Sequence, residues 1–433
     1  MWRPRGLLWR NGDFLFLWSA QTVSEFGSQV TTLALPLAAI YVLKATTFEV
    51  AALGVVEFLP FVLFSLPAGV WVDRLRRRPI MIAADCGRAA ALASIPLAYV
   101  AGALTLGQLY VVGFFAGVLT VFFDVSYQSY LPSLVERDQL GDGNSKLQIS
   151  GSAAQVGGPG LAGVLVGAFS APYAIAVDAA SFVGSALLMT AIKRVEELPA
   201  ALAGSRRRMR AEIGEGLGYV FRHPLMRPMM FWVATANFFG TLIGSILIVY
   251  AVRVLHISAA EIGLIFSVAN VGALVGAVIG TRLAKRFGIG RTLIGLAAAN
   301  GWASLLIPLA SGSLAIPLLV AAQLMSGFCA VAANVNGISL VQAITPDRLL
   351  GRMNASRRFV VWGVFPLGGL VGGLLGSTVG IREAIWIGAV GGSVAFVPLL
   401  FSSVPQVITT EDGEKMVQAI NEEFALRHAA AHS

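Results

Sequence analysis

Long stretches without a single charged side chain limit what this chain can fold into. The longest, Thr292–Pro346, has 55 residues and contains no Asp, Glu, Lys or Arg. A helix needs about 20 apolar residues to cross the hydrocarbon core of a bilayer, so this stretch predicts two spans. We place the turn between them at Ser311–Ser313. Only 12% of all residues are charged, against about 25% in soluble domains, which predicts an all-α membrane protein.

Charged residues, caps and clusters of Gly, Pro and Ser divide the chain into twelve predicted transmembrane helices. Their approximate limits are 14–43, 47–72, 79–101, 105–130, 147–169, 172–192, 228–252, 258–281, 290–310, 314–342, 355–380 and 383–404. The helices form two pseudo-symmetric bundles of six. The predicted domains are a cytoplasmic N-terminal arm (1–13), a first bundle (14–192), a cytoplasmic linker (193–227), a second bundle (228–404) and a cytoplasmic tail (405–433).

The distribution of basic residues predicts the orientation in the membrane. In this map, 27 of the 31 Lys and Arg residues lie on the side of the two termini, three lie on the opposite side, and Arg88 falls within a span. Basic loops stay in the cytoplasm, so we expect both termini to be cytoplasmic, in a multi-pass protein of the cell membrane. The net charge of +8 then needs no nucleic-acid partner, and the basic run Arg206–Arg210 is better explained by anionic lipid headgroups.

The two halves carry weak signs of an internal duplication. A shift of 209 positions superposes one aspartate, one leucine and three glycines of the first half on identical residues of the second: Asp138, Leu140, Gly160, Gly163 and Gly167 on Asp347, Leu349, Gly369, Gly372 and Gly376. Parallel repeats with a binding site between them are an architecture of secondary transporters.

A charged motif lies between the second and third predicted helices. Gly69, Asp73, Arg74, Arg77 and Arg78 match the pattern Gly-x-x-x-Asp-Arg-x-Gly-Arg-Arg, with an arginine in place of its second glycine. In this motif the sequence resembles the major facilitator superfamily. Within that superfamily it is most similar to the transmembrane-secretion exporters, which include enterobactin exporters and macrolide efflux proteins. The stretches that carry this closer resemblance are LPSLVERDQL, DAASF, YVFRHPLMR, and TPDRLLGRMNASRRF followed by PLGGLVGGLLG.

We expect this motif to form a latch between alternating states. Gly69 would let its helix approach a neighbour closely, and the arginines would hold the loop in the cytosol. Asp73 can accept hydrogen bonds from Arg77 or from the N-terminus of the following helix. The family's charge relay implies Asp124 as a second acceptor. The alternative is a loop that serves only to set the topology.

Several ionisable residues fall inside predicted spans of the first half. Each costs roughly 2.5–3.5 kcal/mol at a span centre, so each must face protein or water. They are Glu25, Glu57, Asp85, Arg88, Asp124 and Asp178. Glu25 shares one helix face with Gln21 and Gln29, a polar stripe that predicts a cavity lining. Glu25 or Glu57 would carry a coupling proton; the alternative is a buried acid that serves packing.

We predict structural roles for Asp85, Arg88 and Asp178. Asp85 and Arg88 are spaced i, i+3 and should pair.

The second half offers neutral polar groups to the cavity instead. The amides predicted to line it are Asn237, Asn270, Gln323 and Asn334, with the aromatic residues Phe238, Phe239 and Trp362. Packing of small residues is the alternative role for any one of them.

The predicted helix 147–169 contains a further motif. Gly158, Pro159 and Gly163 resemble the antiporter motif Gly-Pro-x-x-Gly-Gly, with Ala162 in place of one glycine. Pro159 should bend the helix, and the small residues should let a partner helix pack closely. In the family this motif accompanies export.

Other function classes lack their sequence signals. No Gly-Lys dipeptide occurs, which excludes a P-loop, and Cys86 and Cys329 lie in apolar contexts. We expect no metal, no cofactor and no enzymatic activity. The predicted function is proton-coupled efflux of a small amphipathic or hydrophobic compound by a monomer that exchanges it for protons, with drug resistance as one outcome. The alternatives are an uptake carrier or facilitator, and a non-transporting scaffold.

Overall fold

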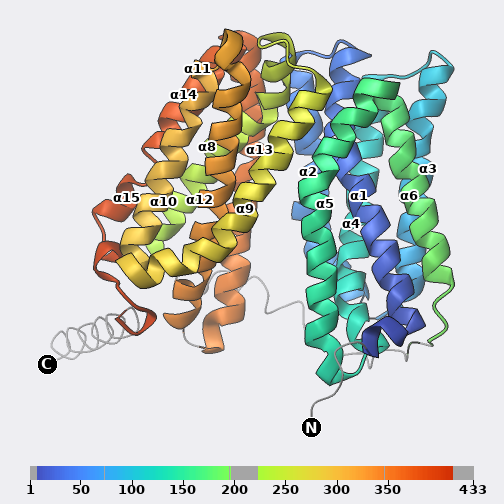
Figure 1. Ribbon diagram of the computed structural model, residues 1–433, viewed down its shortest axis with the longest axis horizontal. Coiled ribbons are helices and arrows are strands. Elements are labelled where there is room, and N and C mark those ends of the chain that lie inside the picture. Colours follow the sequence, from blue (N-terminus) through green and yellow to red (C-terminus); the bar gives the residue numbers. More distant parts are fainter. Residues whose placement is uncertain (1–6, 73, 195, 197–222, 346, 413–433) are drawn as a thin grey trace, which may run out of the picture. The chain divides into compact units, whose positions relative to one another are not determined.

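The computed structural model describes residues 7–72, 74–194, 196, 223–345 and 347–412, and these are mainly helical (Figure 1). The long helices are α1 (Gly12–Tyr41), α2 (Thr47–Val72), α3 (Arg77–Val100), α4 (Leu106–Leu134), α5 (Leu140–Phe169), α6 (Ala171–Thr190), α8 (Met226–Arg253), α9 (Ala259–Phe287), α10 (Ile289–Ser304), α12 (Ala315–Ala343), α13 (Asp347–Thr378) and α14 (Ile381–Ser393). The short helices are η1 (Leu7–Arg10), η2 (Arg137–Gln139), α11 (Leu306–Leu309), η3 (Gly312–Leu314), α15 (Val397–Leu400) and η4 (Val404–Gln406).

Most predicted limits agree with these bounds to within a few residues, but two helices begin earlier than predicted. α5 starts at Leu140 rather than 147, and α13 starts at Asp347 rather than 355. Both extensions contain charged residues, which the span prediction assigned to loops. In α5 the ion pair between Lys146 Nζ and Asp142 Oδ1, at 2.8 Å and i, i+4 spacing, supports the added turns.

Two predicted spans are interrupted. The ninth divides at Leu305 into α10 and α11, and the twelfth divides before α15. A proline follows each break, Pro308 and Pro398, and proline removes a backbone N–H donor from the helix ladder. The turn predicted at Ser311–Ser313 is confirmed, since Gly312 there has a positive φ of 51°.

Eleven helical segments of the described chain are long and apolar enough to cross a membrane. Helix α1, with 30 residues, is long enough but is not one of them. The polar stripe predicted around Glu25 accounts for this, because it lowers the hydropathy of the helix. The structure therefore supports a multi-pass membrane protein.

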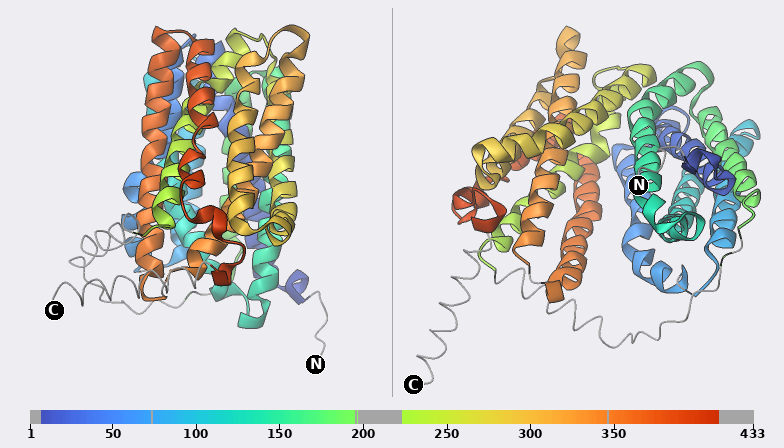
Figure 2. Two further views of the ribbon diagram at one scale, coloured as in Figure 1. Left: turned by 90° about the vertical axis from the view of Figure 1, so that its left-hand side faces the viewer. Right: turned by 60° about the horizontal axis from the view of Figure 1, so that its bottom comes forward.

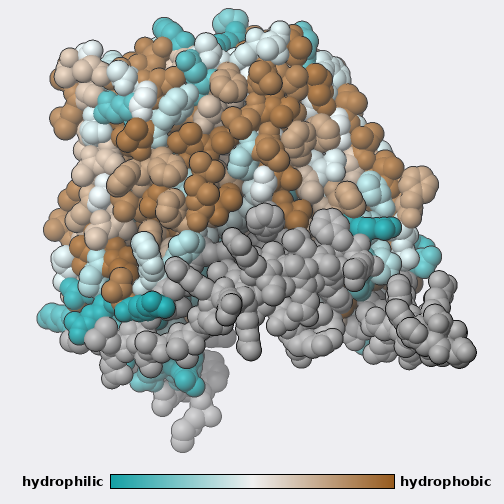
Figure 3. All heavy atoms as spheres, turned by 180° about the vertical axis from the view of Figure 1, so that it is seen from behind, coloured by the Kyte–Doolittle hydropathy of each residue, from teal (hydrophilic) through white to brown (hydrophobic). Residues whose placement is uncertain are grey.

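Hydrophobic side chains point outward along these helices, as lipid-facing residues do. Figure 3 shows hydrophobic residues over the middle of one face and hydrophilic residues nearer its edges. Leu97 and Val100 are each 70% exposed. Because the described surface is so apolar, its natural surroundings are hydrocarbon.

Contacts group the chain into two compact units. The first unit contains residues 1–204, 244–267 and 369–382, and the second contains 205–243, 268–368 and 383–433. The predicted division at the linker 193–227 remains a prediction, since most of that linker lies outside the described residues.

Helices α1–α6 form the body of the first unit. Helix α1 packs against α5 and α6, α3 packs against α4 and α6, and α2 packs against α4 (Figures 1 and 2). A buried cluster at one end includes Phe14, Leu17, Met81 and Tyr130. At that end Asn11 caps α1, because its side chain accepts a hydrogen bond of 3.1 Å from the backbone N–H of Phe14.

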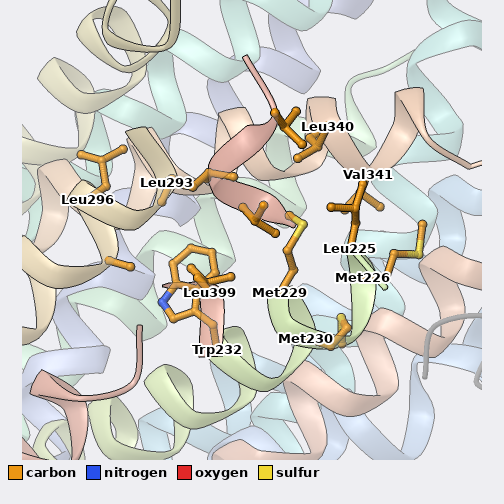
Figure 4. Close-up of a cluster of buried hydrophobic side chains, with 14 of the residues drawn as sticks. Leu225, Met226, Met229, Met230, Trp232, Leu293, Leu296, Leu340, Val341 and Leu399 are labelled. Carbon is orange, nitrogen blue, oxygen red and sulfur yellow. The ribbon is translucent and has the colours of Figure 1, made fainter. Parts of the chain in front are cut away.

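The second unit has its own hydrophobic core. Figure 4 shows this cluster, in which Met229 and Trp232 of α8, Leu293 of α10 and Leu399 of α15 are buried. Helix α10 packs against α12. The segment after η4 joins this core through backbone hydrogen bonds, one of them from Ile289 N–H to Ile408 O at 3.0 Å.

Candidate functional site

A buried ion pair lies inside the first unit, between α3, α4 and α6. Arg88 Nη2 donates to Asp85 Oδ1, as the i, i+3 spacing predicts, and Asp85 Oδ2 accepts a hydrogen bond of 2.6 Å from Ser185 Oγ. The Arg88 guanidinium also lies 4.5 Å from the ring centre of Phe123 and 4.1 Å from that of Phe182. A cation held between two aromatic faces and a carboxylate is well compensated.

Other acids of the first unit lie around this guanidinium. Arg88 is close enough to act electrostatically on Glu25, Asp124 and Asp178. Glu25 accepts a hydrogen bond of 2.8 Å from Gln21 Nε2 on the preceding turn of α1. Gln21 is buried, and Glu25 and Gln29 are half-buried. The predicted role of this polar stripe as a cavity lining stays a prediction.

Asp178 connects α6 to α1 in the same unit. Its carboxylate accepts hydrogen bonds from Thr31 Oγ1 and, at 3.0 Å, from Ser181 Oγ. It is only 1% exposed. A Cβ added at Gly27 of α1 would lie 2.1 Å from Ser181 Oγ, so only glycine allows this close approach.

Glu57 of α2 is placed differently from Glu25. It packs against α4, where a Cβ added at Gly113 would lie 3.0 Å from Glu57 Cγ. Another added at Gly117 would lie 2.8 Å from the Glu57 carbonyl oxygen. Within the described part of the chain, Glu57 and Asp124 have no hydrogen-bond or ion-pair partner.

The glycine motif of α5 packs closely, as predicted. Gly158 is buried, and a Cβ there would lie 2.3 Å from Gln29 Cβ of α1. Gly163 approaches the Ala259 carbonyl in the same way, again within the first unit. Helix α5 continues through Pro159 from Leu140 to Phe169.

The motif between α2 and α3 shows contacts other than those predicted. Asp73 lies outside the described residues. Glu196 accepts from the backbone N–H of Arg77 at 2.6 Å and from Arg77 Nη1 at 2.9 Å, which is the capping role we expected of Asp73. Arg78 donates to the carbonyl of Met189 at 3.0 Å. Asp124 of α4 lies within electrostatic reach of Arg88 and Glu25, and its predicted role at this loop stays a prediction because Asp73 lies outside the described residues.

Two positions of that motif, Gly69 and Arg74, make no close contact with a neighbouring helix in the described part of the chain. A Cβ added at Gly69 would meet no described atom within 4 Å, so the predicted close helix contact is not seen. Arg74 is exposed. The part of this motif that the structure describes therefore ties α3 to the segment after α6 through Arg77 and Arg78.

The second unit contains a cavity of about 560 Å³. Four helices contribute one strongly polar side chain each: Asn237 of α8, Asn300 of α10, Asn334 of α12 and Arg357 of α13. The remaining lining is apolar or soft and includes Met229, Met230, Trp232, Cys329, Val361 and Trp362. This volume and this mixture of a few polar groups in an apolar wall are typical of small-molecule sites.

The structure places only some of the predicted second-half residues at this cavity. Asn237, Asn334 and Trp362 line it, whereas Asn270 and Gln323 do not. Sequence reasoning missed Asn300 and Arg357. The topology count treated Arg357 as a cytoplasmic loop charge, although it lies ten residues inside α13. The position of Arg357 within a continuous helix, and not in a loop, is the signal that could have identified it as a cavity residue.

A histidine at the start of the second unit was also missed. His223 Nδ1 accepts hydrogen bonds from the backbone N–H groups of Leu225, at 3.2 Å, and Met226, at 3.3 Å. It thus caps α8, just outside the membrane-spanning segment. Burial lowers the pKa of His223 from 6.5 to about 4. The neutral ring is the form that can accept these bonds.

Among the residues that the structure describes, no three His, Cys, Asp or Glu side chains gather in a way that could hold a metal ion.

Comparison with known proteins identifies relatives along almost the whole chain. The family model described as transmembrane secretion effector matches residues 8–428. An uncharacterized MFS-type transporter, YfiS, of Bacillus subtilis is 27% identical over 388 residues, 88% of this chain and 91% of that protein. Macrolide efflux protein A of Streptococcus pyogenes is 29% identical over 188 residues, 43% of this chain and 45% of that protein.

Two further comparisons span most of the chain. The multidrug efflux pump Tap of Mycolicibacterium fortuitum is 23% identical over 389 residues, 86% of this chain and 91% of that pump. The fold is similar to that of a bacterial homologue of the iron transporter ferroportin in an inward-facing state, with a TM-score of 0.72 and 18% identity over 91% of this chain and 98% of the other. The chain belongs to the transmembrane secretion effector family of membrane transporters, of the major facilitator type.

Proposed function

We propose that this protein is a proton-coupled exporter of small amphipathic or hydrophobic compounds. The observation that carries the proposal is the cavity of the second unit, lined by three amides, one guanidinium and an apolar wall. The family description and the efflux relatives support outward transport. Lipophilic drugs and siderophores are therefore the first substrates to test, and drug resistance is one expected consequence.

The proposed mechanism is alternating access between two six-helix bundles, 14–192 and 228–404, in a monomer of the cell membrane with cytoplasmic termini. Carboxylates of the first unit supply the proton chemistry. Glu25, Glu57 and Asp124 are the candidates, because each is an acid within a helix of that unit and only half-buried. A carrier needs one such group to be charged in one state and neutral in the other. Exchange of a proton for substrate makes the transporter an antiporter.

The decisive experiment measures proton flux driven by substrate. The purified chain is reconstituted into liposomes that contain a pH-sensitive dye, and a panel of lipophilic drugs and siderophores is added. We expect proton movement only with compounds whose accumulation also falls in cells that express the gene. A non-transporting scaffold would give no substrate-dependent proton flux, and that result would overturn the proposal.

The second candidate function is uptake by a carrier or facilitator of the same fold. Accumulation distinguishes the two directions. An exporter lowers the amount of compound inside expressing cells when a proton gradient is present, and addition of an uncoupler restores it. An uptake carrier raises that amount.

Topology is tested separately with single cysteines in a chain that lacks Cys86 and Cys329. Cysteines in the linker 193–227 should resist membrane-impermeant thiol reagents in intact cells, and a cysteine at Gly102 should react. The opposite labelling pattern would overturn the proposed orientation.

A further inference from the structure

We propose that the cavity of the second unit selects amphipathic molecules that carry a negative charge, and that Arg357 is the residue that reads the charge. This inference rests on the proposed function and names the substrate class of the same site. Arg357 is the one charged residue among the described residues that line the cavity. No Asp or Glu is present in that lining. A guanidinium keeps its positive charge at any physiological pH.

The positive charge of Arg357 should determine whether the cavity binds anions or cations, because the rest of the wall is largely apolar. Met230, Trp232, Val361 and Trp362 make much of the wall apolar. Charges interact more strongly in such a medium than in water. A ligand cation next to Arg357 would be repelled, whereas a carboxylate or sulfonate could accept two parallel hydrogen bonds from the guanidinium. The cavity therefore favours an anionic or strongly accepting head group.

The amides add a second requirement. Asn300 Oδ1 is buried and has no hydrogen-bond partner among the described residues. A buried acceptor without a donor is unfavourable, so a ligand that brings a hydroxyl or N–H group to it gains binding free energy. Asn237 and Asn334 extend from α8 and α12 into the same cavity. We thus expect ligands with a donor group in addition to the anionic group.

The wall sets the shape of the rest of the ligand. Two tryptophans, two methionines and Cys329 line the cavity, and sulfur side chains adapt to different surfaces. A cavity of about 560 Å³ accommodates a molecule of drug size. The inferred substrate class is an aromatic or other apolar body of variable shape that carries one negative group and at least one donor.

Binding of three matched naphthalene probes tests this inference. The probes are 2-naphthylacetate, its carboxamide, and 2-naphthylethylammonium, which share one apolar body and differ in charge. The full chain is placed in nanodiscs of uncharged lipid at pH 7, and binding is measured by quenching of tryptophan fluorescence, to which Trp232 and Trp362 of the cavity wall contribute. We expect the wild type to bind the carboxylate at least tenfold more tightly than the ammonium probe, with the carboxamide between them.

Variants assign this preference to Arg357. Arg357→Gln should abolish the preference for the carboxylate probe. Arg357→Lys should keep the order of the three affinities with weaker binding of the carboxylate, because lysine keeps the positive charge but lacks the two parallel N–H donors of the guanidinium. Arg286→Gln is the matched control, since Arg286 is an exposed basic residue of the same unit that does not line the cavity. It should leave all three affinities within about twofold.

A hydroxylated probe tests the role of Asn300 independently. We expect 6-hydroxy-2-naphthylacetate to bind about fivefold to tenfold more tightly than the unsubstituted acid in the wild type and equally in Asn300→Ala. This arm remains informative if Arg357→Gln fails to fold. Equal or tighter binding of the ammonium probe by the wild type overturns the inference, as does an unchanged preference in Arg357→Gln.

The outcome is separable from that of the proposed function, because binding needs no gradient. Gradient-driven transport of cations without binding of the anionic probes would overturn only the inference. Binding of the anionic probes without gradient-driven transport would overturn only the proposed function.

Discussion

The two units solve the problem of polar groups in a membrane protein in different ways. The first unit gathers carboxylates around one buried cation, so that Arg88 compensates Asp85 and acts on Glu25 and Asp124. The second unit carries neutral amides and one guanidinium on the wall of a cavity. Charges that compensate each other can be buried densely, whereas a cavity that must admit a ligand needs donors that the ligand can satisfy. In the function proposed above, the first unit accordingly supplies the proton chemistry and the second unit recognises the ligand.

The largest expected loss of stability comes from removing one partner of the buried Asp85–Arg88 ion pair in the first unit. Asp85→Asn should destabilise the protein by about 3–5 kcal/mol, because it leaves the Arg88 guanidinium buried without its carboxylate. Thermal unfolding of the purified protein in detergent measures this loss.

Asp142→Asn is the matched control, since the Asp142–Lys146 pair is exposed on the carboxylate side and should contribute at most about 0.5 kcal/mol. Equal losses in the two variants would show that the pair at Asp85 does not differ from a surface pair. Replacement of Asp85 and Arg88 together by Leu and Met should recover most of the stability.

The next effect concerns transport rather than stability. If Glu25 carries the coupling proton, Glu25→Gln should keep substrate exchange across liposomes without a gradient and lose gradient-driven accumulation. One charge moved across 100 mV corresponds to about 2.3 kcal/mol. Because about 1.4 kcal/mol corresponds to a tenfold concentration ratio, the variant should lose a roughly 50-fold ratio of substrate concentrations across the membrane.

Glu57→Gln is the control for this prediction. If Glu57 carries the proton, the two phenotypes exchange. Normal pumping by both variants would remove both acids from consideration, and Asp124 or another ion would then have to be tested.

The two units also differ in how they bind the two ends of the linker 193–227. In the first unit the contact is between charged side chains, Glu196 and Arg77. Glu196 is 7% exposed and bonds to both the backbone and the side chain of Arg77. Glu196→Gln should destabilise the first unit by about 1–2 kcal/mol, since hydrogen bonds to charged groups contribute more than neutral ones. Differential scanning fluorimetry in detergent measures the shift, and an unchanged melting temperature in Glu196→Gln would mean that this contact is not maintained in solution.

At the other end of the linker, the neutral His223 caps α8 of the second unit. We expect its replacement to cost less stability than that of Glu196. The pKa of His223 is about 4 in the folded protein against the ordinary histidine value of 6.5, so the unfolded state binds the proton first as the pH falls. The stability that His223 contributes is complete above pH 6.5 and is lost between pH 6.5 and about 4. At pH 7, His223→Ala should cost about 1 kcal/mol through loss of the cap.

His223→Asn serves as the control, because asparagine caps helices and does not titrate. It should keep the stability at pH 7 and show a smaller loss on acidification than the wild type. Identical pH profiles of wild type and His223→Asn would contradict the assignment.

Local signals in the sequence were sufficient for much of the fold and for part of the site. The spans followed from charge-free stretches, and the pairing of Asp85 with Arg88 followed from their spacing on one helix. The contact between Gln21 and Glu25 likewise joins residues four positions apart on one helix. These features depend on residues within one helix or on composition, which a linear pattern contains.

Features that depend on contacts between distant residues could not be predicted. Glu196 caps α3 from 119 residues away, at the place where Asp73 was expected to act. Asn270 and Gln323 are not among the residues that line the cavity of the second unit, and their predicted role toward a site between the two halves stays a prediction.

The sequence by itself determined that this chain is a helical membrane protein, because hydropathy over about 20 residues decides membrane insertion. It also determined where the intramembrane acids are, since these charges stand out in apolar stretches. Only the tertiary structure decided that Asn237, Asn300, Asn334 and Arg357 share one cavity. Those residues come from four helices, and the rotation of each helix is set by packing against its neighbours, which no single stretch of sequence encodes.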